Sequence, residues 1–280
     1  MLEKRMADEY LEDYQLYLRE NEKSNLKIKK YVHELMCFFQ FLNGDTITKA
    51  KILEYREWLQ NQNQARTVNA KLSAIHSYLE YTGLSCCKVR FLKIQRNVFM
   101  DDERDLNEAE YRRLLEAAKG SKNRRLYYVM VAICGTGIRV SELPFLTVEA
   151  VCRGKVEICM KGKTRTVLLT RELLKKLKAY VKVCEIQSGV IFRTRNGKPL
   201  DRSNIGHDMK KLCKAARVNP RKVFPHNLRH LFAKSYYAIK KNLANLADIL
   251  GHSSVETTRI YVATGVREHE RTLQKMRLIL

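Results

Sequence analysis

Several features of exported, membrane-bound and disulfide-bonded proteins are missing from this sequence of 280 residues. Its first nine residues contain no apolar core of the kind that a secretory signal peptide requires. No apolar run approaches the roughly eighteen residues that span a membrane. Its eight cysteines form no C-x-x-C pair, and neither internal repeats nor low-complexity tracts occur. These absences predict a cytoplasmic protein with no membrane partner, whose cysteines are free and mostly buried thiols.

Acidic residues are scarce relative to basic ones. The chain has 53 Lys and Arg residues against 30 Asp and Glu residues, which gives a formal net charge of +23. Residues 101–280 hold 37 of the basic residues and 18 of the acidic ones, so most of the excess lies in this part. Such an excess favours a polyanionic partner, with nucleic acid first, over a surface that is basic only for solubility. Charge alone does not distinguish DNA from RNA or anionic lipid.

The first hundred residues predict a small bundle of four or five short helices. Apolar residues recur there at helical spacing, and polar or glycine-containing stops separate the segments. The predicted helices cover residues 7–20, 31–42, 49–59 and 68–81, with Thr48 as the N-cap of the third. The stretch 91–105 breaks this periodicity and resembles an exposed linker. We therefore expect one domain over residues 1–98 and another over residues 103–280.

The second domain is predicted to be mostly helical with one small sheet. Residues 155–160 and 166–169 alternate in polarity like two short strands, and the basic turn 161–165 joins them. Pro225 suits the first turn of a helix, and Gly251 suits a helix stop. The predicted helices cover residues 107–119, 124–134, 171–184, 203–216, 226–240, 243–250 and 254–262. The predicted fold class is mainly α: a helical-bundle domain, then a mostly helical domain with a small antiparallel β-sheet.

One segment suited to binding phosphate runs from Gly135 to Leu143. Two of its glycines allow the backbone to turn tightly just before Arg139, and a helix can begin near Ser141. A guanidinium beside a helix N-terminus and the free N–H groups of that helix can bind the same anion. This pattern makes Arg139 a candidate phosphate ligand.

Two further segments combine histidine with arginine or tyrosine. On a helix, His226, Arg229 and His230 share one face through their i, i+3 and i+4 spacing. Farther along the chain, His252 follows the pair Leu-Gly and precedes Tyr261 by nine residues. Taken singly, each of these residues fits packing or a surface ion pair better than catalysis.

Two metal- or nucleotide-binding interpretations fail on single residues. A zinc site of the H-E-x-x-H type needs a glutamate after its first histidine, but Asn227 follows His226. A phosphate-binding P-loop that ends in Gly162-Lys163-Thr164 needs glycine at position 157, which is Glu157 here. No carboxylate cluster lies near the three segments, so neither a metal nor a cofactor is predicted.

Taken together and in order, these patterns strongly resemble the tyrosine recombinases of the phage integrase family. The order is G-x-R-x-S-E-L, a basic hairpin turn, H-x-L-R-H, L-G-H and a final tyrosine, and the segment 246–261 (LADILGHSSVETTRIY) is the most specific part. The resemblance covers essentially the whole chain. It implies a core-binding (SAM-like) domain over 1–98 and a catalytic domain over 103–280. We expect no extra small domain before the first, as in compact Xer-type members or a compact mobile-element recombinase.

The resemblance implies which residues touch the scissile phosphate. Arg139 and Arg229 would bind its non-bridging oxygens. Tyr261 would attack it to form a 3′-phosphotyrosyl bond and release a 5′-hydroxyl. His230 is expected to pack rather than to react. The phosphotyrosyl bond conserves the energy needed for rejoining, so the reaction would need neither metal nor ATP.

Proton transfers are assigned by the same resemblance. A phenol titrates near pH ~10, so His226 and His252 would give hydrogen-bonding and acid–base support to the attacking tyrosine. Lys161, in the hairpin turn, would protonate the leaving 5′ oxygen, with Lys163 as the competing candidate. Glu142 would orient the site.

The resemblance also implies double-stranded DNA as the partner, clamped by the two domains. The family acts as a tetramer on two DNA sites, built from one chain or with a related recombinase subunit. The tail 262–280 is expected to pack on a neighbouring subunit, the alternative being a final helix folded back in cis. A DNA-binding protein without strand exchange and a type IB topoisomerase are the alternative functions. The sequence sets neither the DNA target nor the choice between integration, excision, inversion and dimer resolution.

Overall fold

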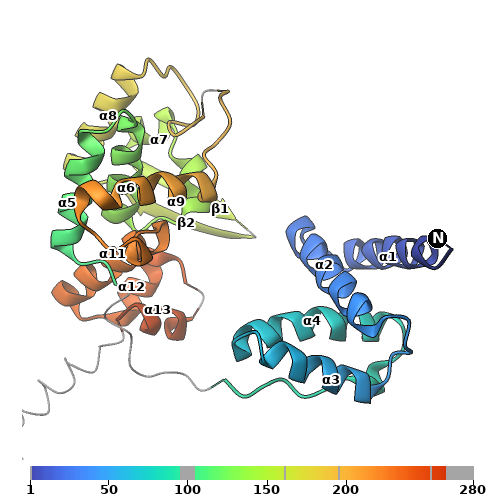
Figure 1. Ribbon diagram of the computed structural model, residues 1–280. Helices are drawn as coiled ribbons and strands as arrows, with labels where there is room; N and C mark the ends of the chain where they lie inside the picture. Colours follow the sequence, from blue (N-terminus) through green and yellow to red (C-terminus); the bar gives the residue numbers. More distant parts are fainter. Residues whose placement is uncertain (1, 95–104, 161, 195, 253, 263–280) are drawn as a thin grey trace, which may run out of the picture. The chain divides into compact units, whose positions relative to one another are not determined.

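The computed structural model describes residues 2–94, 105–160, 162–194, 196–252 and 254–262. The chain divides into two compact units, Met1–Arg96 and Asn97–Leu280, each with its own hydrophobic core (Figure 1). We call them the N-terminal unit and the C-terminal unit. Both are mainly helical, and the described residues contain one two-stranded antiparallel sheet, which confirms the predicted fold class. None of the described helices is both long and apolar enough to cross a membrane.

The N-terminal unit is a helical bundle that ends in a short 3-10 helix. Its elements are α1 (Leu2–Glu20), α2 (Asn25–Leu42), α3 (Lys49–Gln60), α4 (Ala65–Tyr81) and η1 (Ser85–Cys87). The Thr48 hydroxyl accepts a hydrogen bond from the backbone N–H of Lys51 at 3.2 Å, which confirms the predicted N-cap of α3.

Helix α2 begins at Asn25, earlier than the predicted start at residue 31. Ile28 lies in this added turn and is only 4% exposed, so the turn is anchored by the core. Because lysines flank Ile28 on both sides, the apolar periodicity of the sequence does not reveal this single buried residue. Tertiary packing thus sets this helix start.

Aromatic rings fill much of the N-terminal core. Tyr14, Phe38 and Tyr55 are at most 1% exposed. Tyr14 meets Tyr78 edge-on with ring centroids 5.2 Å apart, and the Phe38 and Tyr55 centroids are 5.0 Å apart. Edge-on and tilted pairs of this kind hold helices in fixed relative positions.

The C-terminal unit is built mainly of helices around one β-hairpin. Its elements are α5 (Glu108–Lys119), α6 (Arg124–Thr136), η3 (Val140–Phe145), α7 (Val148–Arg153), β1 (Lys155–Met160), β2 (Lys163–Leu168), α8 (Arg171–Val183), α9 (Arg202–Lys211), α10 (Cys213–Ala216), η4 (Pro220–Lys222), α11 (Pro225–Lys240), α12 (Leu243–Leu250) and α13 (Val255–Val262). Pro225 opens α11 and Gly251 ends α12 in the left-handed region, as predicted.

The hairpin is longer on its second strand than predicted. Lys155 pairs with Leu168 and Met160 with Lys163, so β2 begins at Lys163 rather than at residue 166. The first three residues of β2 are Lys163, Thr164 and Arg165, and polar residues of this kind do not mark a strand by alternation. The turn is correspondingly shorter, and the strand carries Arg165 inward toward the helices.

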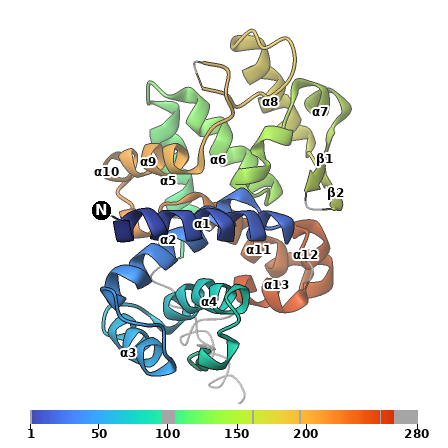
Figure 2. The ribbon, with the colours of Figure 1, turned by 90° about the vertical axis from the view of Figure 1, so that its right-hand side faces the viewer.

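Helix α6 forms the centre of the C-terminal unit and packs against α11 and α8. Its buried face includes Val129, Met130 and Ile133, which are fully shielded from solvent. Helices α12 and α13 pack against α11, where the last part of the described chain lies (Figures 1 and 2). A small second core of Ala233, Leu246, Leu250 and Tyr261 joins these three helices. Tyr261 is therefore positioned by packing.

Three predictions about the C-terminal unit and the cysteines need correction. The helix predicted over 203–216 breaks at Leu212 into α9 and α10, and the short helix α7 was not predicted. The cysteines are free thiols, but only Cys213 is buried, so the expectation that most are buried is wrong. A short apolar residue on a charged surface segment costs little to expose, which explains the error. Part of the predicted linker (95–104) and nearly all of the tail predicted to pack on a neighbour (263–280) lie outside the described residues.

Candidate active site

Tyr261 lies on α13 and is 8% exposed. Three histidine rings surround its ring: the centroids of His226, His230 and His252 lie 5.4, 5.4 and 5.3 Å from it. Two of the histidines come from α11 and one from the turn after α12. The structure therefore brings the predicted nucleophile together with both predicted histidines and with His230, which the sequence analysis assigned to packing.

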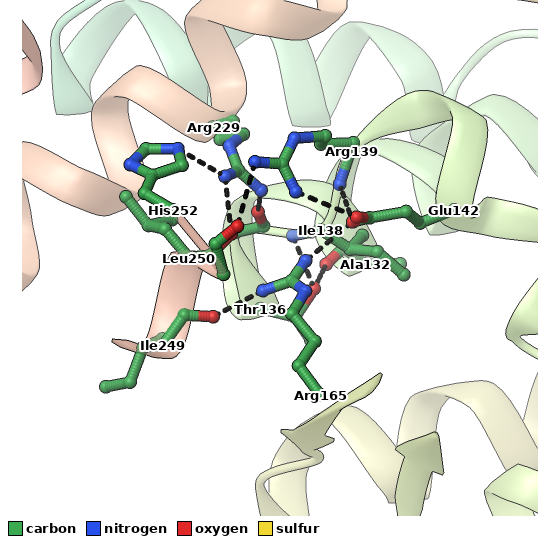
Figure 3. A network of polar contacts seen from close by, with 12 residues as sticks. Ala132, Thr136, Ile138, Arg139, Glu142, Arg165, Arg229, Ile249, Leu250 and His252 are labelled. Carbon is green, nitrogen blue, oxygen red and sulfur yellow. Dashed lines mark hydrogen bonds and ion pairs between the residues drawn. The ribbon is translucent and has the colours of Figure 1, made fainter. Parts of the chain in front are cut away.

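Arg229 lies on the same face of α11 and is only 1% exposed. Its Nη1 donates to the carbonyl oxygen of Gly137, and its Nη2 donates to that of Leu250 at 2.8 Å (Figure 3). Burial first, and then the charge of Arg139, lower the pKa of Arg229 to about 10, while Tyr261 acts in the opposite direction. Arg229 therefore stays charged at neutral pH and fixes the ends of α6 and α12 beside the tyrosine.

The hydrogen bonds of His252 define its tautomer. Its Nε2 lies 2.9 Å from Nη2 of Arg229, and its Nδ1 lies 2.8 Å from the hydroxyl of Thr258, which is fully buried. Arginine is only a donor, so Nε2 must accept and the proton sits on Nδ1. Burial first, and then the charges of Arg229, Arg139 and Arg165, lower the pKa of His252 to about 4. His252 is neutral in this geometry.

Arg139 is held by a buried carboxylate. Its backbone N–H and its Nη1 donate to the two oxygens of Glu142 at 2.8 and 2.9 Å, and its Nη2 donates to the carbonyl oxygen of Gly251 at 3.3 Å. Burial raises the pKa of Glu142, but the Arg139 backbone N–H and the charges of Arg165 and Arg139 outweigh it and lower the pKa. The side chain of Glu142 is 4% exposed and that of Arg139 is 39% exposed. A buried carboxylate therefore holds a guanidinium that still reaches solvent.

A cleft of about 410 Å³ opens onto these groups. Its lining includes Arg139, Arg202, His226, Arg229 and Tyr261. Desolvation by the surrounding side chains, followed by the charge of Arg229, lowers the pKa of His226, so this histidine is neutral at pH 7. The cleft thus presents positive guanidinium groups, a neutral imidazole and a phenol, which suits one phosphodiester anion.

Arg202 is a lining residue that the sequence analysis missed. It is the first residue of α9, directly after Asp201, which caps the helix by accepting from the Ser203 N–H at 2.8 Å. The signal available in the sequence was a basic residue in the first turn of a helix with an acidic N-cap, where a cation is unfavourable for the helix itself. A residue placed against helix preference is a candidate for function.

The predicted general acid is not placed by the structure. Lys161 lies outside the described residues, and of Lys163 only the backbone is described. The choice between these two lysines therefore stays a prediction. Among the described residues, no group of histidine, cysteine, aspartate and glutamate side chains could hold a metal ion.

Two family models match the chain. The phage integrase family matches residues 104–267, more than half of the chain, and the phage integrase N-terminal SAM-like domain matches residues 11–82. Among curated proteins, tyrosine recombinase XerA of Pyrococcus furiosus is 27% identical over 100% of this chain and 98% of its own length. Tyrosine recombinase XerD of Vibrio cholerae is 30% identical over 78% of this chain and 77% of its own length.

Solved structures agree with this match. A crystal structure of XerA recombinase is 26% identical, with a TM-score of 0.54 over 98% of this chain and 100% of that one. A lambda integrase tetramer bound to a Holliday junction is 18% identical, with a TM-score of 0.70 over 93% of this chain and 80% of that one, and shares the fold. The chain therefore belongs to the phage integrase family. It is a tyrosine recombinase, an enzyme that breaks and rejoins DNA, and its relatives include the Xer-type members.

Proposed function

We propose that this enzyme cuts and rejoins double-stranded DNA at specific sites through a covalent bond to Tyr261. The observation that supports this most directly is the arrangement around the tyrosine: Arg139, Arg229 and His226 line one cleft with it, and the ring of His252 stacks against its ring. The phenol oxygen attacks the phosphorus in line and forms a 3′-phosphotyrosyl bond, while the bond from phosphorus to the 5′ oxygen breaks. A 5′-hydroxyl of another strand then reverses the step and releases the tyrosine.

Arg139 and Arg229 stabilise the charge that gathers on the non-bridging oxygens as phosphorus becomes five-coordinate. A preorganised donor of this kind contributes roughly 3–4 kcal/mol to the transition state. Hydrogen bonds within the protein support this preorganisation. Glu142 accepts from Arg139, and the carbonyl oxygens of Gly137 and Leu250 accept from Arg229. Both guanidinium groups are therefore already in position before the substrate binds.

Proton transfer completes the reaction. His226 is neutral and lines the cleft, so it can accept the phenol proton directly or through water. The ring of His252 stacks against that of Tyr261, and its Nε2 accepts from Arg229 and so helps to hold the arginine. Lys161 in the hairpin turn protonates the leaving 5′ oxygen, with Lys163 as the alternative.

The working assembly is a tetramer on two DNA sites, formed by this chain alone or with a related recombinase. This proposed number of subunits is supported by the lambda integrase tetramer on a Holliday junction, which shares this fold. The enzyme serves integration, excision, inversion or dimer resolution of DNA, on a mobile element or a chromosome, and it acts in the cytoplasm.

Trapping of the covalent adduct tests the nucleophile. The protein is incubated in EDTA with labelled duplexes from the DNA flanking its gene, each nicked beside the presumed cleavage position, and adducts are resolved on denaturing gels. Tyr261→Phe must abolish the adduct. Tyr237→Phe, which alters a partly buried tyrosine packed against the same small core, serves as the matched control and must retain it.

Three results would contradict parts of the proposal. An adduct that persists in Tyr261→Phe rules out this nucleophile. Tight binding without an adduct on any duplex favours a DNA-binding protein without strand exchange. Relaxation of a supercoiled plasmid that carries no site favours a topoisomerase.

A further inference from the structure

Arg165 lies on β2, at the end of the segment predicted as the basic hairpin turn, and the sequence analysis assigned it no role of its own. Its side chain is 13% exposed. Its Nη2 donates to Oε2 of Glu142 at 2.6 Å, and its Nη1 donates to the carbonyl oxygen of Ile249 near the end of α12 (Figure 3). One guanidinium therefore joins three elements that are far apart in the chain: the hairpin, the η3 segment and α12.

The turn after α12 is built around this side chain. Gly251 has φ +63°, and a Cβ at this position would lie 2.3 Å from Cδ of Arg165. The carbonyl oxygen of the same glycine accepts from Nη2 of Arg139. The turn that leads into His252 is thus held on one side by Arg139 and on the other by the stem of Arg165.

Arg165 also determines how Glu142 is shared. Oε1 of Glu142 accepts from Nη1 of Arg139, while Oε2 accepts from the Arg139 backbone and from Nη2 of Arg165. Because Arg165 donates to Oε2, the side chain of Arg139 donates to this carboxylate through Nη1 alone. Without Arg165, a bidentate pair would form readily, since both oxygens of a carboxylate match the guanidinium fork. Arg139 would then turn toward Glu142 and away from the cleft.

We propose that Arg165 is a positioning residue for the strand-cleavage step, which keeps Arg139 aimed at the scissile phosphate and fixes the turn before His252. It acts through Glu142 and the Gly251 turn, and it does not touch the DNA. The inference rests on the proposed function of the cleft, because it assigns Arg165 a part in the same chemistry. It predicts an effect on cleavage that is separate from DNA binding.

Arg165→Met tests the inference against wild type and Arg171→Met. Arg171 is an exposed arginine at the start of α8, outside the cleft, and serves as the charge-matched control. DNA affinity is measured by gel shift, and single-turnover adduct formation is measured on the nicked duplex. We expect Arg165→Met to slow adduct formation by about 100-fold, as a displacement of about 1 Å at a reacting group does, with affinity within about twofold of wild type. Arg171→Met must cleave like wild type.

The pH profile separates positioning from packing. Loss of Arg165 removes one of the positive charges that lower the pKa of Glu142, so this pKa rises. The charged side chains next to Glu142 are Arg139, directly before η3, and Arg165, on β2. As the pH is lowered, adduct formation by Arg165→Met should therefore begin to fall at a higher pH than that of wild type. Glu142→Gln in the same background should remove this extra pH dependence and slow the reaction no further.

Arg165→Lys keeps the positive charge next to Glu142 without the guanidinium fork. It should recover part of the cleavage rate, about tenfold over Arg165→Met. The inference is overturned by equal losses of affinity and cleavage, which indicate a phosphate contact, or by cleavage at the wild-type rate, which indicates packing alone. It is also overturned if Glu142→Gln and Arg165→Met have additive effects. Failure of the proposed function itself would be visible separately, as an adduct of the wild-type protein that does not depend on Tyr261.

Discussion

Nδ1 of His230 lies 2.9 Å from Oδ1 of Asp105, and Oδ2 of the same carboxylate accepts from the ammonium of Lys234. The Asp105 side chain is 11% exposed and the His230 side chain is 7% exposed. The other ring nitrogen of His230, Nε2, is buried without a hydrogen-bond partner among the described residues, and the ring packs edge-on against Tyr261. One carboxylate near the start of the C-terminal unit thereby orients a ring that contacts the nucleophile.

This pair predicts a specific loss of stability. Asp105→Asn should lower the free energy of unfolding by about 1–3 kcal/mol at pH 7, because a partly exposed ammonium and a buried imidazole lose their charged acceptor. Urea unfolding monitored by circular dichroism measures the change. Asp248→Asn, an exposed aspartate on α12, is the control and should change stability by less than about 0.5 kcal/mol.

The pH dependence of that loss has a definite sign. Burial raises the pKa of Asp105, but the hydrogen bonds from His230 and Lys234 outweigh it, so the pKa of Asp105 in the folded protein is lowered. A carboxylate with a lowered pKa stabilises the folded protein at pH values above its unfolded pKa of ~3.9. This stabilisation is lost as the pH falls through the pKa of the folded protein. The difference between wild type and Asp105→Asn should therefore shrink as the pH is lowered below about 4. A difference that is constant from pH 7 to pH 3 would contradict this ion-pair explanation.

His252 should titrate far below an ordinary histidine. NMR titration of labelled imidazoles in the DNA-free protein should give a pKa of about 4 and the tautomer protonated on Nδ1. Because this pKa is lowered in the fold, the neutral ring stabilises the protein fully above the unfolded pKa of about 6.5, and that contribution is lost as pH falls toward 4. Bound DNA should raise the pKa of His252, since the phosphate charge offsets the nearby arginines. A pKa near 6.5, or protonation on Nε2, in the free protein would show that the Arg229 contact is absent.

Gly251 should tolerate alanine worse than Gly189, which has a similar backbone conformation. Gly251→Ala and Gly189→Ala both place a Cβ at positive φ, at +63° and +73°, but only at Gly251 does the added atom meet a side chain, Cδ of Arg165. The conformational cost of about 1–2 kcal/mol is common to both. Overpacking should add roughly 1–3 kcal/mol to the destabilisation by Gly251→Ala. Equal melting temperatures for the two variants would argue against the close approach.

Arg202 should contribute to DNA affinity rather than to the fold. It is exposed and lines the cleft, so Arg202→Met should weaken binding, and the slope of log affinity against log salt should fall by about 1. Gel shifts at several salt concentrations measure this slope, and thermal unfolding should stay unchanged. A lower melting temperature with an unchanged salt slope would assign Arg202 to structure.

The sequence by itself determined the fold class, most helix ends and the order of the site residues. Helix spacing alone places His226, Arg229 and His230 on one face, and caps such as Thr48 and Gly251 act within a few residues of the chain. Local rules of this kind need no knowledge of the rest of the molecule. They fail where a segment is anchored by one buried residue, as at the start of α2.

Only the tertiary structure decided how the site is supported. Arg139 reaches Gly251 across 112 positions of the chain, and Arg165 reaches Ile249 across 84. Neither the Arg165 bridge nor the contact of Asp105 with His230 follows from spacing, because each depends on which helices pack together and at what angle. The residues suited to the chemistry are visible in the sequence, whereas the buried polar contacts that aim them exist only once the C-terminal core has formed.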